Sequence, residues 1–130
     1  MTTSTGSILI VEGDQSANMM LSSKLSREGY YNVAVAPAQY ALAGVRDYDV
    51  VILDDKMPGT PLAELLLALV KRSPDTQVIV AVATIDREKI EESIRLGASD
   101  YVTKPYNNSD VVERVEAAMT RKMQIANNNR

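Results

Sequence analysis

Charged residues follow several short apolar runs of this sequence. Glu12 and Asp14 follow the first run, Asp54 the third and Lys104 the last. A carboxylate directly after four apolar residues, such as Asp54, is poorly solvated unless a cation compensates its charge. Lys104 is the obvious candidate for that cation. With Thr84 near the end of the fourth run, three carboxylates, a lysine and a hydroxyl could converge on one edge of a sheet.

The residue types present limit the chemistry of such a site. The chain has no histidine and no cysteine, which excludes Ser-His-Asp triads, cysteine nucleophiles and thiolate zinc sites. Any acid–base work therefore falls to carboxylates and Lys104. We see no turnover of an external substrate, so we expect the chain not to be an enzyme, beyond assisting chemistry on itself.

Three charged residues at the ends of the apolar runs also have a plainer interpretation. Asp14 precedes a helical segment and could simply be its N-cap. Asp55, which follows Asp54, could be a solvated turn residue, and Lys104 alone could be a surface lysine. Asp54 is harder to dismiss, because its position after a buried run calls for a partner.

The elements that would position these residues follow from the hydrophobic pattern. Five apolar runs, mostly β-branched and without alternation, read as strands that are buried on both faces, as in a parallel sheet. Segments with helical spacing lie between them. We predict an open, doubly wound α/β sheet with helices on both faces, and with its site at the carboxyl ends of the strands. The predicted strands are 8–11, 33–35, 50–53, 78–82 and 101–102.

Length and charge narrow the class of protein further. The chain has 130 residues, which is one domain's worth, and its net charge of −3 attracts no nucleic acid as a whole. No segment is apolar enough to span a membrane, and 1–7 lacks the features of a secretory signal. We therefore expect a cytoplasmic location, no membrane association and no direct binding of nucleic acid.

Together these residues resemble a known family. The resemblance covers Ser7 to about Met123 and rests on Ile8–Glu12, on Tyr48–Asp54 with the Met57-Pro58-Gly59 turn, and on Leu96–Pro105. By these segments the chain is similar to the receiver domain of bacterial two-component response regulators, which has a flavodoxin/CheY-like fold. This implies a five-stranded parallel sheet in the order 2-1-3-4-5. We expect a disordered N-terminus over 1–6, the receiver domain over 7–124, and a frayed tail or the start of a linker over 125–130.

The resemblance implies a role for each matching residue. Asp54 matches the aspartate that accepts a phosphoryl group from a histidine kinase or phosphotransfer protein. Lys104 matches the lysine that pairs with the phosphoryl oxygens, and it begins a cis peptide bond with Pro105. Tyr101 matches an aromatic residue that moves on activation. Through its surface formed by helix 4, strand 5 and helix 5, such a domain meets an output domain, a partner protein or a second copy in a homodimer.

The resemblance also implies a magnesium ion. Glu12 and Asp54 match the acidic residues at the metal, and Lys56 stands where the family offers a backbone carbonyl. The second acid of the family's pair falls on Gly13, so Asp14 would have to replace it. We therefore expect Mg²⁺ to bind weakly, since even indirect losses around a metal cost about 10–100-fold in affinity.

The resemblance also implies a serine or threonine whose hydroxyl binds the phosphoryl group, and this sequence has no hydroxyl at that position. The position is occupied by Val82. Thr84 lies two residues further along the same strand face, roughly 7 Å away. Two hypotheses remain: a phosphorylated receiver domain with a weakened site, which Asp54 and Lys104 favour, and a pseudo-receiver that binds proteins without phosphorylation. A flavodoxin-like cofactor site is disfavoured, because 12–14 present negative charge where a phosphate would bind.

Overall fold

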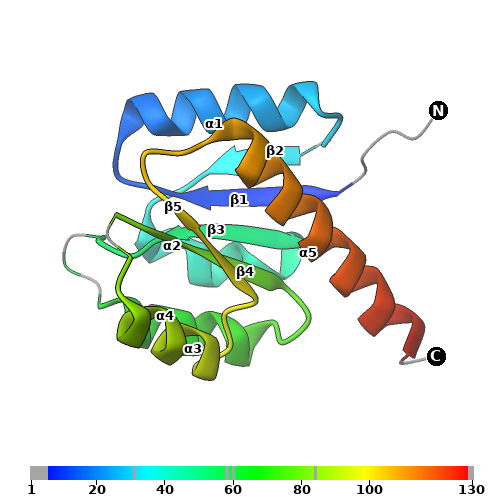
Figure 1. The fold of residues 1–130 in the computed structure, drawn as a ribbon. Coiled ribbons are helices and arrows are strands. Elements are labelled where there is room, and N and C mark those ends of the chain that lie inside the picture. The colour runs from blue at the N-terminus through cyan, green and yellow to red at the C-terminus, as the bar shows by residue number, and fades with distance from the viewer. Residues whose placement is uncertain (1–5, 31, 58, 60, 84, 129–130) are drawn as a thin grey trace.

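The computed structural model describes residues 6–30, 32–57, 59, 61–83 and 85–128, and these form alternating strands and helices (Figure 1). The elements are β1 (Ser7–Val11), α1 (Gln15–Arg27), β2 (Asn32–Val35), α2 (Ala38–Gly44), the 3-10 turn η1 (Val45–Asp47), β3 (Val50–Asp54), α3 (Leu62–Arg72), β4 (Gln77–Val82), α4 (Arg87–Arg95), β5 (Asp100–Thr103) and α5 (Asn108–Asn128).

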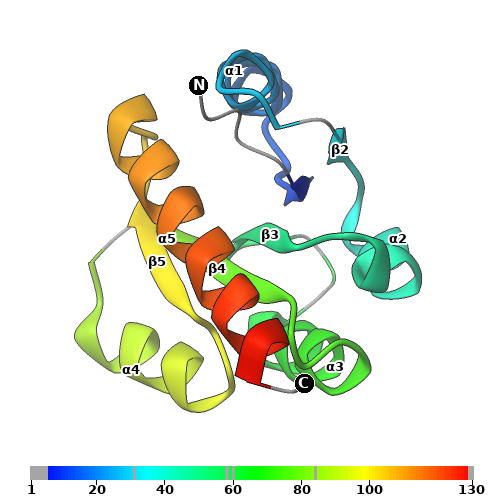
Figure 2. The same ribbon diagram turned by 90° about the vertical axis from the view of Figure 1, so that its right-hand side faces the viewer.

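The five strands form one sheet in the order β2-β1-β3-β4-β5, and every neighbouring pair is parallel. This confirms the predicted fold class and strand order. Helices α1 and α5 cover one face of the sheet, while α2, α3 and α4 cover the other (Figure 2). A sheet covered on both faces is the arrangement that continuous apolar strands require.

Alternation along the strands divides the interior into two cores. Ile8 and Ile10 of β1 pack with α1 and α5, whereas Leu9 and Val11 pack with α2 and α3. All five residues of β1 and of β3 are buried. Polar groups can therefore lie only at or beyond the ends of these two strands, and a parallel sheet of this kind places its site at the carboxyl ends.

The C-terminal helix differs from the prediction. We expected a frayed tail or the start of a linker from 125, but α5 continues to Asn128, so 125–128 are helical. The physical reason is that neither glycine nor proline follows Pro105, so no residue type stops the helix. The predicted disordered segment lies outside the described residues except for Gly6, which is buried.

In the part of the chain that the structure describes, none of the helices combines the length and apolar character needed to span a lipid bilayer.

Candidate functional site

The ammonium group of Lys104 joins two buried carboxylates at the carboxyl edge of the sheet. Lys104 Nζ lies 2.8 Å from Asp54 Oδ1 and 3.2 Å from Glu12 Oε1. Glu12 is 6% exposed and Asp54 is 4% exposed. The three residues are far apart in the sequence, so the sheet itself assembles this cluster of one cation and two anions.

The register of the sheet explains how the cluster forms. Val11 of β1 pairs with Leu53 of β3, so the next residues, Glu12 and Asp54, leave adjacent strands side by side. Lys104 continues beyond β5, and its backbone N–H donates to the carbonyl of Val82 at 2.8 Å. The Lys104–Pro105 peptide bond is cis, as the resemblance implied.

The environment of Asp54 favours its anionic form. Burial alone raises the pKa of this carboxyl, but the hydrogen bond from Lys104 and a 3.1 Å bond from the Lys56 backbone N–H outweigh it, so the pKa lies below its ordinary value. Burial likewise lowers the pKa of Lys104, but its hydrogen bond to Asp54 more than compensates, so that pKa is raised. Both groups are therefore charged at neutral pH, and Asp54 is held as an anion without losing its hydrogen-bond partners.

Glu12 has a partner that sequence reasoning missed. The Tyr106 hydroxyl donates to Glu12 Oε1 at 2.8 Å, and the Asp14 backbone N–H donates to Oε2 at 2.9 Å. Burial, followed by the hydrogen bond to Glu12, raises the pKa of Tyr106, so its hydroxyl stays protonated. Only the position of Tyr106, directly after Lys104-Pro105, hinted that it would reach the site.

Asp14 does not join the cluster with its side chain. Its Oδ1 accepts from the backbone N–H groups of Ser16 and Ala17 at 2.8 and 3.3 Å, so it is the N-cap of α1. Within the described residues, no group of three acidic, histidine or cysteine side chains is placed to hold a metal ion. Thus the structure brings Glu12, Asp54 and Lys104 together as predicted but leaves the Asp14 carboxylate out, because capping α1 satisfies it.

Gly13 leaves open space at the position where the resemblance predicted the second acid of the family's pair. A Cβ built at this residue would meet no heavy atom within 4 Å, and Gly13 is exposed. The missing carboxylate is therefore not replaced by another group at that point, although the backbone would accept one. Of the predicted ligands for a cation, the carboxylates of Glu12 and Asp54 lie together. The Lys56 carbonyl stays a prediction.

Two of the three predicted switch residues lie on described strands, Val82 on β4 and Tyr101 on β5. Val82 is 2% exposed in an apolar core and has no polar group. Thr84 lies outside the described residues. Tyr101 is half-buried, with the Arg114 guanidinium 5.5 Å from the centroid of its ring, and Arg114 in turn donates to Asp100 at 2.7 Å. The ring is therefore held from outside by a paired cation.

Asp55 is not the solvated turn residue that we considered. Its side chain is only 3% exposed, and Oδ1 has no hydrogen-bond partner among the described residues. The closest cation is Lys89 of α4, with Nζ 3.9 Å from Oδ2. The pleat of β3 turns Asp55 to the opposite face from Asp54, toward α4. Burial, aided by the charge of Asp54, therefore raises its pKa despite Lys89.

Comparisons with known proteins agree with this geometry. Residues 8–116 match the model of the response regulator receiver domain. The chain is 32% identical over 117 residues to the sensory transduction protein RegX3 of Mycolicibacterium smegmatis, covering 88% of this chain and 51% of the relative. It is 30% identical over 116 residues to the DNA-binding response regulator MtrA of the same organism, covering 88% and 50%. It also resembles a solved CheY-like receiver domain protein of Methanospirillum hungatei, with a TM-score of 0.84, 27% identity, and coverage of 93% and 98%.

The chain belongs to the response regulator receiver domain family, and it is a signal-transduction domain of two-component systems. It spans about half the length of the curated relatives that it matches. Receiver domains generally bind Mg²⁺ at an acidic site, and they act with kinases and output domains. The comparisons support phosphoryl-accepting signal transduction, and the pseudo-receiver alternative gains no support from them.

The buried charge of Asp55 leads to a prediction for stability. We expect Asp55→Asn to raise the free energy of unfolding at neutral pH by about 1 kcal/mol, because it removes a buried charge whose Oδ1 has no hydrogen-bond partner among the described residues. Since folding raises the pKa of Asp55, the native wild type binds this proton more tightly than the unfolded chain does. The penalty on the wild type is thus present above the native pKa and fades as the pH falls toward the ordinary aspartate value.

Urea unfolding of both proteins from neutral to mildly acidic pH measures this difference, which should shrink as the pH falls. The matched control is Asp75→Asn at an exposed aspartate, which should change stability by less than about 0.5 kcal/mol. A gain in the control equal to that in Asp55→Asn would contradict the interpretation, as would no gain in Asp55→Asn.

Proposed function

We propose that this domain accepts a phosphoryl group on Asp54 from the phosphohistidine of a histidine kinase or phosphotransfer protein. The supporting observation is the 2.8 Å contact between Lys104 Nζ and Asp54 Oδ1. An oxygen of Asp54 forms a bond to phosphorus while the bond from phosphorus to the donor's imidazole nitrogen breaks, and the electron pair stays on that nitrogen. Phosphoryl transfer depends mainly on positioning and on neutralising charge, and Lys104 is suited to both.

Lys104 serves as the cation for the new phosphoryl oxygens. Its long side chain ends between two carboxylates and is 22% exposed, so the ammonium has access to a group that arrives from solvent. As the phosphoryl group forms on Asp54, the charge-assisted hydrogen bond can pass from the carboxylate to a phosphoryl oxygen. The domain acts on no external substrate in this proposal, because its chemistry is confined to its own aspartate.

Glu12, Asp54 and the Lys56 carbonyl are the groups that would hold Mg²⁺. This donor set fits the ion, since magnesium is commonly bound by one or two carboxylates together with phosphate oxygens and waters. When bound, the ion would neutralise charge on the phosphoryl oxygens. Affinity should be low, because Gly13 supplies no carboxylate and Lys104 already occupies the space between the two acids.

We infer that phosphorylation drives this domain only part of the way to a second state. The missing hydroxyl at Val82 forfeits about 1.5–3 kcal/mol of hydrogen bonding to a charged group, whereas a complete two-state switch needs about 5.5 kcal/mol. Val82 also fills the space into which an aromatic ring would move. Tyr101 should therefore keep one rotamer, and Arg114 above its ring reinforces that expectation.

The output surface in this proposal is formed by α4, β5 and α5. Beside Tyr101 it has a hollow of about 250 Å³, and Ile85 and Ile94 are exposed on it. Apolar groups near a hollow suit contact with a protein, so the partner is an output domain, a separate protein or a second copy of the chain. We also propose that this domain is located in the cytoplasm.

The direct test is phosphorylation with a small donor such as acetyl phosphate. Wild type should gain the mass of one phosphoryl group in the presence of Mg²⁺, while Asp54→Asn should gain none. Asp55→Asn is the matched control and should still be modified, because its side chain faces away from Lys104. Intact-protein mass spectrometry gives the readout. Labelling of Asp54→Asn at the wild-type level would refute Asp54 as the acceptor.

A second prediction concerns the open position at Gly13. Gly13→Asp should tighten Mg²⁺ binding by at least about tenfold, because it restores a carboxylate in space that no other atom occupies. Calorimetric titration measures the affinity, and Gly13→Ala, which adds a side chain without a ligand, should leave it unchanged. If Gly13→Asp combined with Val82→Thr alters neither the affinity nor the rate of phosphorylation, these two positions have been assigned wrongly.

A further inference from the structure

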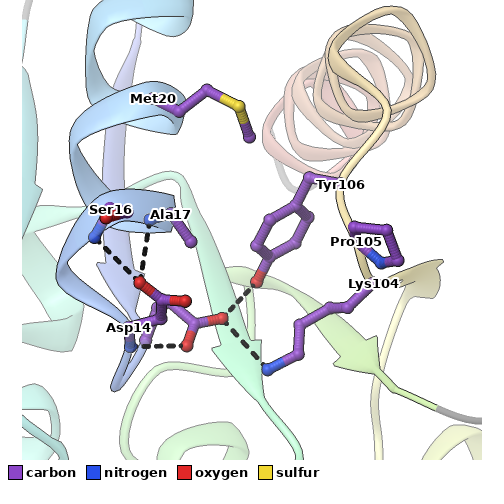
Figure 3. A pocket seen from close by; sticks show the side chains of 8 residues that line it. Asp14, Ser16, Ala17, Met20, Lys104, Pro105 and Tyr106 are labelled. Atoms are coloured by element: carbon purple, nitrogen blue, oxygen red, sulfur yellow. Dashed lines mark hydrogen bonds and ion pairs between the residues drawn. The ribbon is translucent and has the colours of Figure 1, made fainter.

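Glu12 accepts three hydrogen bonds from other groups of the protein. Lys104 Nζ and the Tyr106 hydroxyl both donate to Oε1, at 3.2 and 2.8 Å, and the Asp14 backbone N–H donates to Oε2 at 2.9 Å. Figure 3 shows Lys104 and Tyr106 pointing into the pocket beside Asp14. A carboxylate that is 6% exposed thus has three donors without a metal ion.

Packing holds the hydroxyl of Tyr106 in place. Its ring is partly buried and lies against the core beneath α1 and α5. Ring and hydroxyl form one wall of a pocket of about 340 Å³ between α1 and the segment after β5, whose other lining residues include Ala17, Met20 and Pro105. Because the ring is already fixed, little conformational entropy is lost when the hydroxyl donates to Glu12.

One of these three donors leaves when the site works. If Lys104 moves to a phosphoryl group on Asp54, Glu12 keeps only Tyr106 and the backbone N–H. A buried carboxylate without compensation is strongly unfavourable. Gly13 supplies no acid that would help to recruit a metal ion to this place, so among the described residues the Tyr106 hydroxyl is the side-chain donor that Glu12 keeps.

We propose that Tyr106 is a positioning residue whose hydroxyl stabilises Glu12 in the metal-free site and so lowers the site's demand for Mg²⁺. This rests on the proposed function, because it assigns Glu12 to the metal site of a phosphorylated receiver domain. A metal ion must compete with the hydroxyl for Glu12. Removing the hydroxyl therefore raises the free energy of the metal-free state more than that of the metal-bound state.

The test compares Mg²⁺ binding to the unphosphorylated domain in wild type, Tyr106→Phe and Tyr40→Phe. Tyr40 is 63% exposed on α2, so its hydroxyl serves as the matched control. We expect Tyr106→Phe to bind Mg²⁺ about tenfold more tightly in calorimetry, the factor expected for one hydrogen bond to a charged group. Its melting temperature should fall without Mg²⁺ and recover more than that of wild type when the ion is added. Tyr40→Phe should match wild type in both respects.

Unchanged or weaker Mg²⁺ binding in Tyr106→Phe would overturn the proposal, since the hydroxyl would then not compete with the metal. A measurement on wild type covers the case in which Tyr106→Phe fails to fold. The NMR signal of the Tyr106 ring carbon that carries the hydroxyl should shift on titration with Mg²⁺, and no shift would also overturn the proposal. Phosphorylation of Asp54 by acetyl phosphate is scored separately, so failure of this inference is distinguishable from failure of the proposed function.

Discussion

The arrangement at the carboxyl edge of the sheet depends on one cation between two buried anions. Lys104 Nζ contacts Asp54 and Glu12, and neither carboxylate is exposed enough for water to replace it. Removing one partner of a buried ion pair typically costs about 3–5 kcal/mol, because the other charge is left uncompensated. The position of Lys104 beyond β5 is therefore tied to the ends of β1 and β3, and this contact favours the anionic form of Asp54.

Around Lys104, several residues differ from those that the resemblance implied. Gly13 supplies no carboxylate and Val82 supplies no hydroxyl, and for this reason we propose that metal binding and the response to phosphorylation are both weakened. Tyr106 donates a hydrogen bond to Glu12, and we proposed that this lowers the site's demand for Mg²⁺. Asp55 adds a buried negative charge on the α4 side of β3, with Lys89 as its nearest cation. In the proposed function, Asp54 is the nucleophile and Lys104 its counter-ion, while the groups around them differ from those that the resemblance implied.

The sequence predicted those parts of the structure that depend on local pattern and strand ends. Apolar runs located the strands, and the residues directly after them included Glu12, Asp54 and Lys104, because parallel strands place their carboxyl ends at one edge. The strand order and the cis peptide bond came from the resemblance. For Asp14 the sequence left N-cap and metal ligand open, and in the structure its side chain caps α1.

Other features depend on packing that no local pattern contains. Tyr106 contacts Glu12 across 94 residues, and this contact depends on how the segment after β5 packs beside α1. Asp55 looked like a turn residue, because its burial comes from α4, which the chain reaches only after β4. The end of α5 was placed too early because the polar composition of the last residues resembles a tail, while nothing in the sequence interrupts the helix.

The pairing of Lys104 with Asp54 can be tested most directly by an NMR pH titration of the Asp54 side-chain carboxyl carbon. In wild type we predict a pKa below the ordinary aspartate value of about 3.9, because the hydrogen bonds from Lys104 and the Lys56 backbone outweigh the effect of burial. In Lys104→Gln the cation is absent while the burial and the neighbouring Glu12 remain, so the pKa of Asp54 should rise above that value. An Asp54 pKa that is the same in both proteins would contradict the account, as would one above the ordinary value in wild type.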